Sequence, residues 1–165
     1  MPLGYLAAAQ RIEIELGPIE GACLDVGCNT GSGMLALAKR WPKTLWYGLE
    51  PSAKFVIAAQ AKGLNVDCGE AEATPYGDGT FDFVFSRHSL EHMRHRESAI
   101  YECWRVLRQG GCLYVQAPIE PEGTKNKLHV SPFLSLEELR GSFPMFTEVY
   151  WGPQPTVGEF MGRKT

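Results

Sequence analysis

Short apolar segments alternate with amphipathic segments along the chain. Apolar runs bounded by glycine, proline or polar residues predict strands over 22–26, 45–49, 65–68, 81–85 and 112–117. Apolar residues at helical spacing predict helices over 5–16, 34–40, 53–62 and 97–108. The last third adds a short helix opened by Ser135 and strands over 146–151 and 159–162.

This alternation of strand and helix is typical of an α/β fold. The run over 81–85 is apolar at nearly every position, as expected of a parallel strand that is buried on both faces. We therefore predict a doubly wound, mostly parallel sheet of seven or six strands, with helices on both faces. In such sheets ligands bind beyond the carboxyl ends of the strands.

Composition narrows the class of protein. A chain of 165 residues predicts a single domain over 1–165, and a net charge of −3 disfavours a broad nucleic-acid surface. No apolar run approaches the ~20 residues of a membrane helix, and the first residues lack the basic region of a secretory signal. The five cysteines include no Cys-x-x-Cys pair, so we expect no metal site, no disulfide framework and a cytoplasmic location.

A glycine-rich loop and an acid follow the first two predicted strands. The loop runs from Gly27 to Gly33 directly after strand 22–26, and Glu50 ends the second strand. Glycine allows a tight turn and a close backbone approach to a ligand. A carboxylate at the position of Glu50 suits two hydrogen bonds from adjacent ribose hydroxyls. The alternative is an exposed surface glutamate before a Pro-Ser turn.

Two nucleoside cofactors fit this layout. The stretch Gly31-Ser32-Gly33-Met34-Leu35-Ala36 matches a dinucleotide pattern, but it starts four residues beyond Gly27. The register Asp25-x-Gly27-x-Asn29-x-Gly31-x-Gly33 instead resembles the loop of class I S-adenosylmethionine-dependent methyltransferases, with Asn29 in place of the middle glycine. An acid at Asp25 suits a cofactor with an ammonium and a sulfonium group, whereas it would repel a pyrophosphate.

The resemblance covers about residues 20–118. It includes the segments 69–75, 79–82, 89–92 and 104–111, with weaker likeness over 129–139. It implies a Rossmann-like fold and the cofactor S-adenosyl-L-methionine, which becomes S-adenosyl-L-homocysteine. The cofactor-binding residues that it implies are Asp25, Gly27, Cys28, Asn29, Gly31, Glu50, Pro51, Ser52, Glu70, Ala71, Ser86 and Arg87.

The resemblance also divides these residues among the parts of the cofactor. The loop would line the methionine end, and Glu50 would hold the ribose. Residues 51–52 and 70–71 would border the adenine. Residues 86–88, expected just past strand 81–85, would face the sulfonium and the acceptor, or else form a plain loop.

The reaction implied is an in-line displacement, which depends mainly on alignment of the reacting atoms. A base is needed only where the acceptor arrives protonated, and the catalytic candidates are His88 first and then His92. His92 also fits a packing role, and Glu91 is expected to be a solvated or hydrogen-bonding acid. Arginines 87, 94, 96, 105 and 108 form a basic stretch, which suits either an anionic substrate or a solvated helix face.

The acceptor is constrained mainly by what the sequence lacks. Neither an Asn-Pro-Pro-Tyr or Asp-Pro-Pro-Tyr run nor a Pro-Cys pair occurs, so by analogy transfer to adenine, to a glutamine amide or to cytosine C5 is disfavoured. We expect methyl transfer to a small molecule through oxygen, nitrogen or carbon, with the irregular stretch 118–132 as a lid. The alternatives are a non-catalytic partner subunit and a nicotinamide-dependent oxidoreductase.

Overall fold

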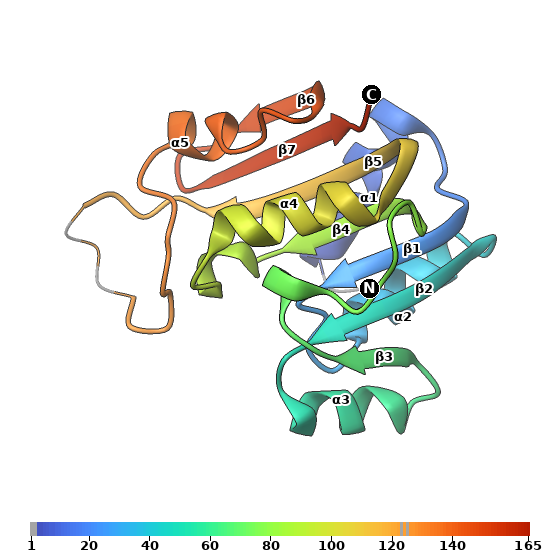
Figure 1. Cartoon of the computed structure of the whole chain (residues 1–165). Helices are drawn as coiled ribbons and strands as arrows, with labels where there is room; N and C mark the ends of the chain where they lie inside the picture. The colour runs from blue at the N-terminus through green and yellow to red at the C-terminus, as the bar shows by residue number, and fades with distance from the viewer. Residues whose placement is uncertain (1–2, 123, 125) are drawn as a thin grey trace.

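One seven-stranded sheet organises the chain, in the order β3-β2-β1-β4-β5-β7-β6 (Figure 1). The computed structural model describes residues 3–122, 124 and 126–165. The strands are β1 (Gly21–Val26), β2 (Thr44–Glu50), β3 (Asn65–Cys68), β4 (Phe81–Arg87), β5 (Leu107–Pro118), β6 (Thr147–Pro153) and β7 (Val157–Arg163). All pairings among β1–β5 are parallel, whereas β7 runs antiparallel to both β5 and β6. The predicted α/β sheet is confirmed, with seven strands.

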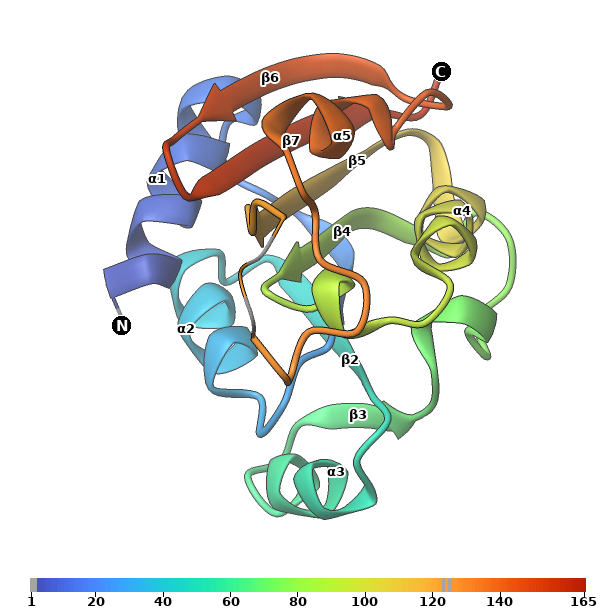
Figure 2. The same ribbon diagram turned by 90° about the vertical axis from the view of Figure 1, so that its left-hand side faces the viewer.

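Helices cover both faces of this sheet. They are α1 (Leu3–Leu16), α2 (Ser32–Arg40), α3 (Ala53–Gln60), α4 (Arg96–Val106) and α5 (Leu136–Gly141), with short 3-10 helices η1 (Ala71–Ala73) and η2 (Leu90–His92). Helices α1, α2 and α3 share one apolar core, and α4 and α5 share the other. Figure 2 looks onto the carboxyl ends of the parallel strands, with the sheet between α2 and α4.

Strand β4 lies between the two cores. Phe81 and Val84 pack in the core under α4, whereas Phe83 and Phe85 pack in the core under α1 and α2. All four side chains are buried. Successive strand residues point to opposite faces, so a strand covered on both sides must be apolar throughout. That requirement explains the apolar run over 81–85, which only Asp82 interrupts.

The predicted ends of several elements are wrong. Strand β4 continues to Arg87, so Ser86 and Arg87 belong to the strand and His88 is the first residue beyond it. Helix α4 ends at Val106, because Leu107 already pairs with Phe81 as part of β5. Glycines 110 and 111 therefore lie inside β5 instead of stopping a helix. The predicted lid over 118–132 starts one residue too early, because Pro118 still belongs to β5. Gly123 and Lys125 of this stretch lie outside the described residues.

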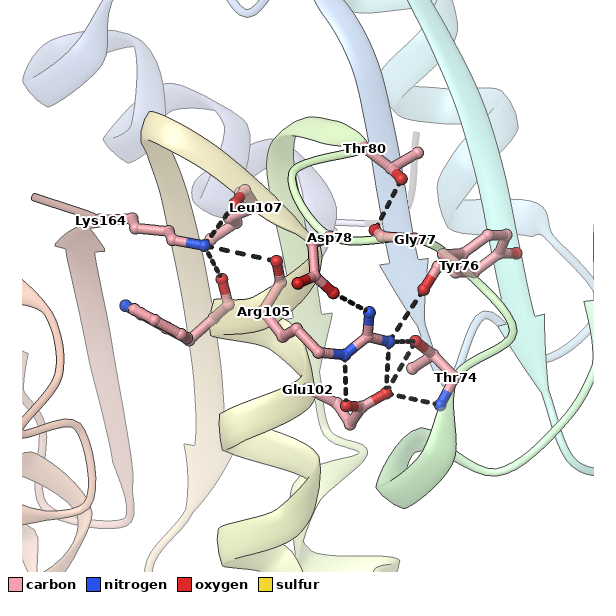
Figure 3. Close-up of polar contacts among 10 residues, drawn as sticks. Thr74, Tyr76, Gly77, Asp78, Thr80, Glu102, Arg105, Leu107 and Lys164 are labelled. Carbon is pink, nitrogen blue, oxygen red and sulfur yellow. Dashed lines mark hydrogen bonds and ion pairs between the residues drawn. The ribbon is translucent and has the colours of Figure 1, made fainter.

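A network of polar contacts fixes the segment between η1 and β4 onto α4 (Figure 3). Arg105 donates to Glu102 Oε1 at 2.7 Å, to Asp78 Oδ1 at 2.6 Å and to the carbonyl of Tyr76 at 2.8 Å. The backbone N–H of Thr74 donates to Glu102 Oε2 at 2.8 Å. Lys164 donates to the carbonyls of Leu107 and Arg105, which suits a cation at a helix C-terminus.

The basic stretch consists largely of paired arginines. Arg105 pairs with Glu102 and Asp78, Arg108 with Asp82, and Arg96 with Glu138. Arg96 is buried, and its guanidinium lies 3.8 Å from the centre of the Phe133 ring. Arg96 and Arg105 therefore join α4 to its neighbours, whereas the exposed Arg108 joins β5 to β4.

Two further findings bear on the class of protein. Among the described helices, none has the length and apolar character that a membrane crossing requires. Within the same described residues all five cysteines are free, and four of them are buried.

Loss of the Glu102 charge is expected to destabilise the fold in a pH-dependent way. Hydrogen bonds from Arg105 hold the pKa of Glu102 below its ordinary value of 4.5. The ionised carboxylate therefore stabilises the fold above about pH 4.5, and this contribution disappears as pH falls through the lowered pKa. Glu102→Gln should lower the free energy of unfolding by about 1–3 kcal/mol at neutral pH, and by less at pH 3, in urea titrations.

The matched control for this prediction is Glu97→Gln. Glu97 is an exposed acid in the first turn of the same helix. Its replacement should change stability by less than about 0.5 kcal/mol. An equal loss for Glu102→Gln at both pH values would contradict the ionic contribution.

Candidate functional site

The loop after β1 turns through three residues with left-handed backbone conformations. Gly27 has φ +74°, Asn29 +52° and Gly31 +74°. A Cβ at Gly27 would lie 2.5 Å from the Cβ of Ser89, so the loop approaches the segment after β4 closely there. Asparagine tolerates the left-handed region better than most residues. Asn29 therefore keeps the turn where the family pattern has glycine.

Glu50 joins this loop to the end of β2. Its Oε2 accepts a hydrogen bond from Asn29 N at 2.9 Å, and its Oε1 accepts one from Ser52 N at 3.1 Å. The side chain is buried rather than an exposed surface glutamate. A carboxylate offers about four lone-pair positions, so two remain after these backbone contacts.

Asp25 is a buried acid inside β1. It is 2% exposed, and Oδ2 has no hydrogen-bond partner in the described part of the protein. Burial raises the pKa of Asp25 to about 7, and the negative charge of Glu50 acts in the same direction. A positively charged group placed beside Asp25 would stabilise the ionised carboxylate and lower this pKa.

A cleft of about 950 Å³ opens at the carboxyl ends of the strands. Its walls come from the loop after β1, the end of β2, the segment around η1 and the segment around η2. The predicted site residues that line it are Gly27, Asn29, Glu50, Pro51, Glu70, Ala71, His88 and His92. The structure thus brings together, at one edge of the sheet, residues that were predicted to contact the ribose, the adenine and the acceptor.

The remaining predicted residues, Asp25, Cys28, Gly31, Ser52, Ser86 and Arg87, do not line the cleft. The Cys28 thiol is buried beside Gly48 in the core. Ser86 Oγ is also buried, 2.6 Å from Ser89 Oγ.

Arg87 reaches α1 instead of the cleft. Its guanidinium carbon lies 5.1 Å from the centre of the Tyr5 ring, and Arg87 Nε is buried without a hydrogen-bond partner among the described residues. Because β4 extends through residue 87, its side chains alternate between the two faces of the sheet. Residues 86 and 87 therefore cannot both face the same ligand.

His88 lines the cleft, and its side chain faces the buried Glu91. His88 has φ +51°, a left-handed conformation, and its Nδ1 lies 3.6 Å from Glu91 Oε1. Glu91 is 1% exposed, so the expectation of a solvated acid is wrong. His92 also lines the cleft, and its Nδ1 lies 2.9 Å from the Leu128 carbonyl.

Sequence reasoning missed several residues of the walls. Phe55 and Met93 contribute apolar surface to the cleft. Glu72 also lines it and accepts hydrogen bonds from the backbone N–H groups of Arg94 and His95. Phe55 lies three residues after Ser52 in a predicted helix, and this helical spacing was a usable signal. Met93 and Glu72 reach the cleft only because η1 packs against the start of α4, and no local sequence pattern predicts that packing.

Comparison with known proteins places the chain beside several methyltransferases. Trans-aconitate 2-methyltransferase of Deinococcus radiodurans is 29% identical over 137 residues, which are 81% of this chain and 52% of that protein. Malonyl-[acyl-carrier protein] O-methyltransferase of Herminiimonas arsenicoxydans is 35% identical over 106 residues, which are 64% of this chain and 40% of that protein. The chain thus spans about half the length of these relatives or less.

A solved structure supports the fold over almost the whole chain. Phosphoethanolamine N-methyltransferase 2 of Haemonchus contortus, in complex with S-adenosyl-L-methionine, superposes with a TM-score of 0.84 at 14% identity. The superposition covers 99% of this chain and 52% of that one. The model of a family described as "Methyltransferase domain" matches residues 24–115, from β1 to β5. Since these residues hold the loop, Glu50 and the cleft, this chain belongs to the methyltransferase domain family.

Proposed function

We propose that this chain binds S-adenosyl-L-methionine and transfers its methyl group to a small-molecule acceptor. The observation that carries the proposal is that a left-handed glycine loop, the buried Glu50 and Asp25 lie at the edge of the sheet that bears the cleft, with Asp25 Oδ2 lacking a hydrogen-bond partner among the described residues. Family membership supports the same conclusion. We further propose that residues 1–165 act as one domain, because a single sheet spans β1 to β7.

The residues present fit this cofactor. The cleft volume of about 950 Å³ lies in the usual range of ~300–1,000 Å³ for ligand sites. The two free lone-pair positions on Glu50 match a pair of ribose hydroxyls. An unpartnered buried carboxylate such as Asp25 favours a cationic ligand group, because a nearby positive charge compensates its desolvation. When bound, the cofactor supplies an electrophilic methyl on a sulfonium.

Each part of the chain then has a distinct role. Gly27 and Asn29 would hold the methionine end through the backbone, and Glu50 would fix the ribose. Glu70 and Ala71 would border the adenine, with Phe55 as an apolar wall. Alignment of this kind is worth ~7–11 kcal/mol of a displacement barrier. We propose that His88 accepts the proton of an acceptor that arrives protonated, because it lies at the cleft beside Glu91.

The acceptor is proposed to be small. The relatives named above are methyltransferases of trans-aconitate and of malonyl-[acyl-carrier protein]. A nicotinamide cofactor is disfavoured by Asp25, whose carboxylate would repel a pyrophosphate. The alternative of a non-catalytic partner subunit would retain cofactor binding without turnover. We also propose a cytoplasmic location, which is supported by the five free cysteines.

Replacement of Glu50 tests the cofactor site. Glu50→Gln removes the charge and leaves one acceptor oxygen, so affinity for S-adenosylhomocysteine should fall at least ~100-fold, since hydrogen bonds to a charged group contribute ~1.5–3 kcal/mol each. Calorimetric titration measures this loss, with thermal melting as the test of folding. Glu20→Gln, at an exposed acid near the opposite end of β1, should bind like the unmodified protein. Unchanged affinity in Glu50→Gln would contradict the assignment.

Asp25→Asn should separate stability from binding. Burial raises the pKa of Asp25 to about 7 in the folded protein. Asp25 therefore destabilises the fold most above pH 7, where the buried carboxyl group must carry a charge. At pH 8 the variant should therefore be more stable than the unmodified protein by at least about 1.4 kcal/mol, the equivalent of one pKa unit. Urea unfolding measures this gain, which should shrink toward pH 4.

The same variant should bind S-adenosylhomocysteine more weakly at pH 8, because the buried carboxylate that would attract the positively charged amino group is gone. At pH 6, where an acid with a pKa of about 7 is still largely protonated, titration calorimetry in two buffers of different ionisation enthalpy should also show loss of the proton that the unmodified protein releases on binding. A variant that is both less stable and equally tight would contradict the role given to Asp25.

His88→Gln tests the proton acceptor. For a phenol or amine acceptor we expect kcat to fall by about 10²–10⁴. The measurement is formation of S-adenosylhomocysteine with a panel of small carboxylates, phenols and amines. A carboxylate acceptor needs no base, so its rate should change much less. Equal losses with both kinds of acceptor would contradict a proton-transfer role.

A further inference from the structure

A second group of chemically active side chains lies at the same edge of the sheet, where one of its members also lines the cleft. Glu91 and His92 belong to η2, and His129 belongs to the connection between β5 and α5. One ligand atom from each of these three residues lies within 4.8 Å of the others. Neighbouring residues in the chain do not account for this grouping, because the connection returns to η2 from more than thirty residues away.

Both histidines are held by their Nδ1 atoms. His92 Nδ1 lies 2.9 Å from the Leu128 carbonyl oxygen, and His129 Nδ1 lies 2.5 Å from Glu120 Oε1. With the proton on Nδ1, each ring donates to these oxygens and keeps the lone pair on Nε2. Histidines that bind metals usually donate their other ring N–H to a carbonyl or a carboxylate in this way. The contacts therefore prepare two imidazole ligands.

Glu91 supplies an independent indication. Its side chain is 1% exposed, and its Oε2 is buried with no hydrogen-bond partner among the described residues. Its other oxygen lies 3.6 Å from His88 Nδ1. A buried carboxylate oxygen without a donor is costly, and a cation is the partner that offsets this cost most directly.

We propose that Glu91, His92 and His129 bind one divalent transition-metal ion, with Glu120 orienting the His129 ring. Two imidazoles and a carboxylate are a ligand set suited to Zn²⁺ and to similar first-row ions, with further positions left for water or a ligand. This proposal does not rest on the proposed methyl transfer. Since His92 also lines the cleft, the ion would lie at its border.

Binding requires only small local movements. The backbone of Glu91 already accepts hydrogen bonds from Val130 N and Ser131 N, both at 3.0 Å, so the two segments are joined. Asn126 Nδ2 lies 3.1 Å from His129 Nε2 and must turn aside for that atom to bind metal. Asn126 is exposed, which leaves its side chain free to rotate toward solvent. The ion would then cross-link η2 to the connection.

The test is titration of the chelator-treated full chain with Zn²⁺ by calorimetry, and with Co²⁺ by visible absorption. We expect one ion per chain and a Co²⁺ spectrum with histidine coordination. His92→Gln and His129→Gln should each weaken binding at least tenfold, and Glu120→Gln should weaken it by about 10–100-fold. His95→Gln removes an exposed histidine outside the cluster and should bind normally.

Cys68→Ser provides a second control, because Cys68 is an exposed thiol that can hold zinc adventitiously. Each variant is first compared with the unmodified chain by thermal melting without metal. Bound metal should also raise the melting temperature of the unmodified chain and not that of His129→Gln. Absence of stoichiometric binding overturns the proposal. Binding that survives both histidine variants, or that is lost with Cys68→Ser, overturns it equally.

Discussion

The burial of both faces of the sheet is the constraint on which the rest of the structure depends. A strand covered on two sides has no place for an unpaired polar side chain, so polar chemistry is confined to strand ends. Strand β4 follows this rule with buried Phe83, Val84 and Phe85 in a row, and its one acid before Ser86, Asp82, is paired with Arg108. The cleft lies at this edge because only there can backbone and carboxylate groups meet a ligand.

Asp25 is an exception to that rule. It lies within β1, fully enclosed, and the charge of Glu50 adds to the cost of its ionisation. Two acids placed together in a dry site store electrostatic energy that a cationic ligand can release. Glu50 differs from Asp25 because two backbone N–H groups already satisfy it in part. The pair therefore combines one carboxylate that backbone N–H groups stabilise with one whose ionisation is costly.

The opposite wall of the cleft depends on ion pairs instead of apolar packing alone. Arg105 and Glu102 fasten the residues after η1 to α4, and Glu72 holds the backbone at the start of that helix. Arg96 joins the same helix to α5 through Glu138. The arginines that make one stretch of sequence strongly basic are thus mostly neutralised in space. The local charge of a sequence stretch does not determine the charge of the surface that it forms.

The sequence by itself determined the element order, the α/β class and the glycine loop after β1, because hydrophobic period and glycine spacing are local signals. It also placed Glu50 and His88 at strand ends, which a parallel sheet brings to one edge. Only the tertiary structure decided the extent of β4, because pairing with β5 carries it through Arg87 and turns that side chain toward Tyr5. It also decided that Glu91 is buried and that His129 returns to His92. Burial and contacts between distant segments arise from packing of the whole chain, which no local pattern of residues specifies.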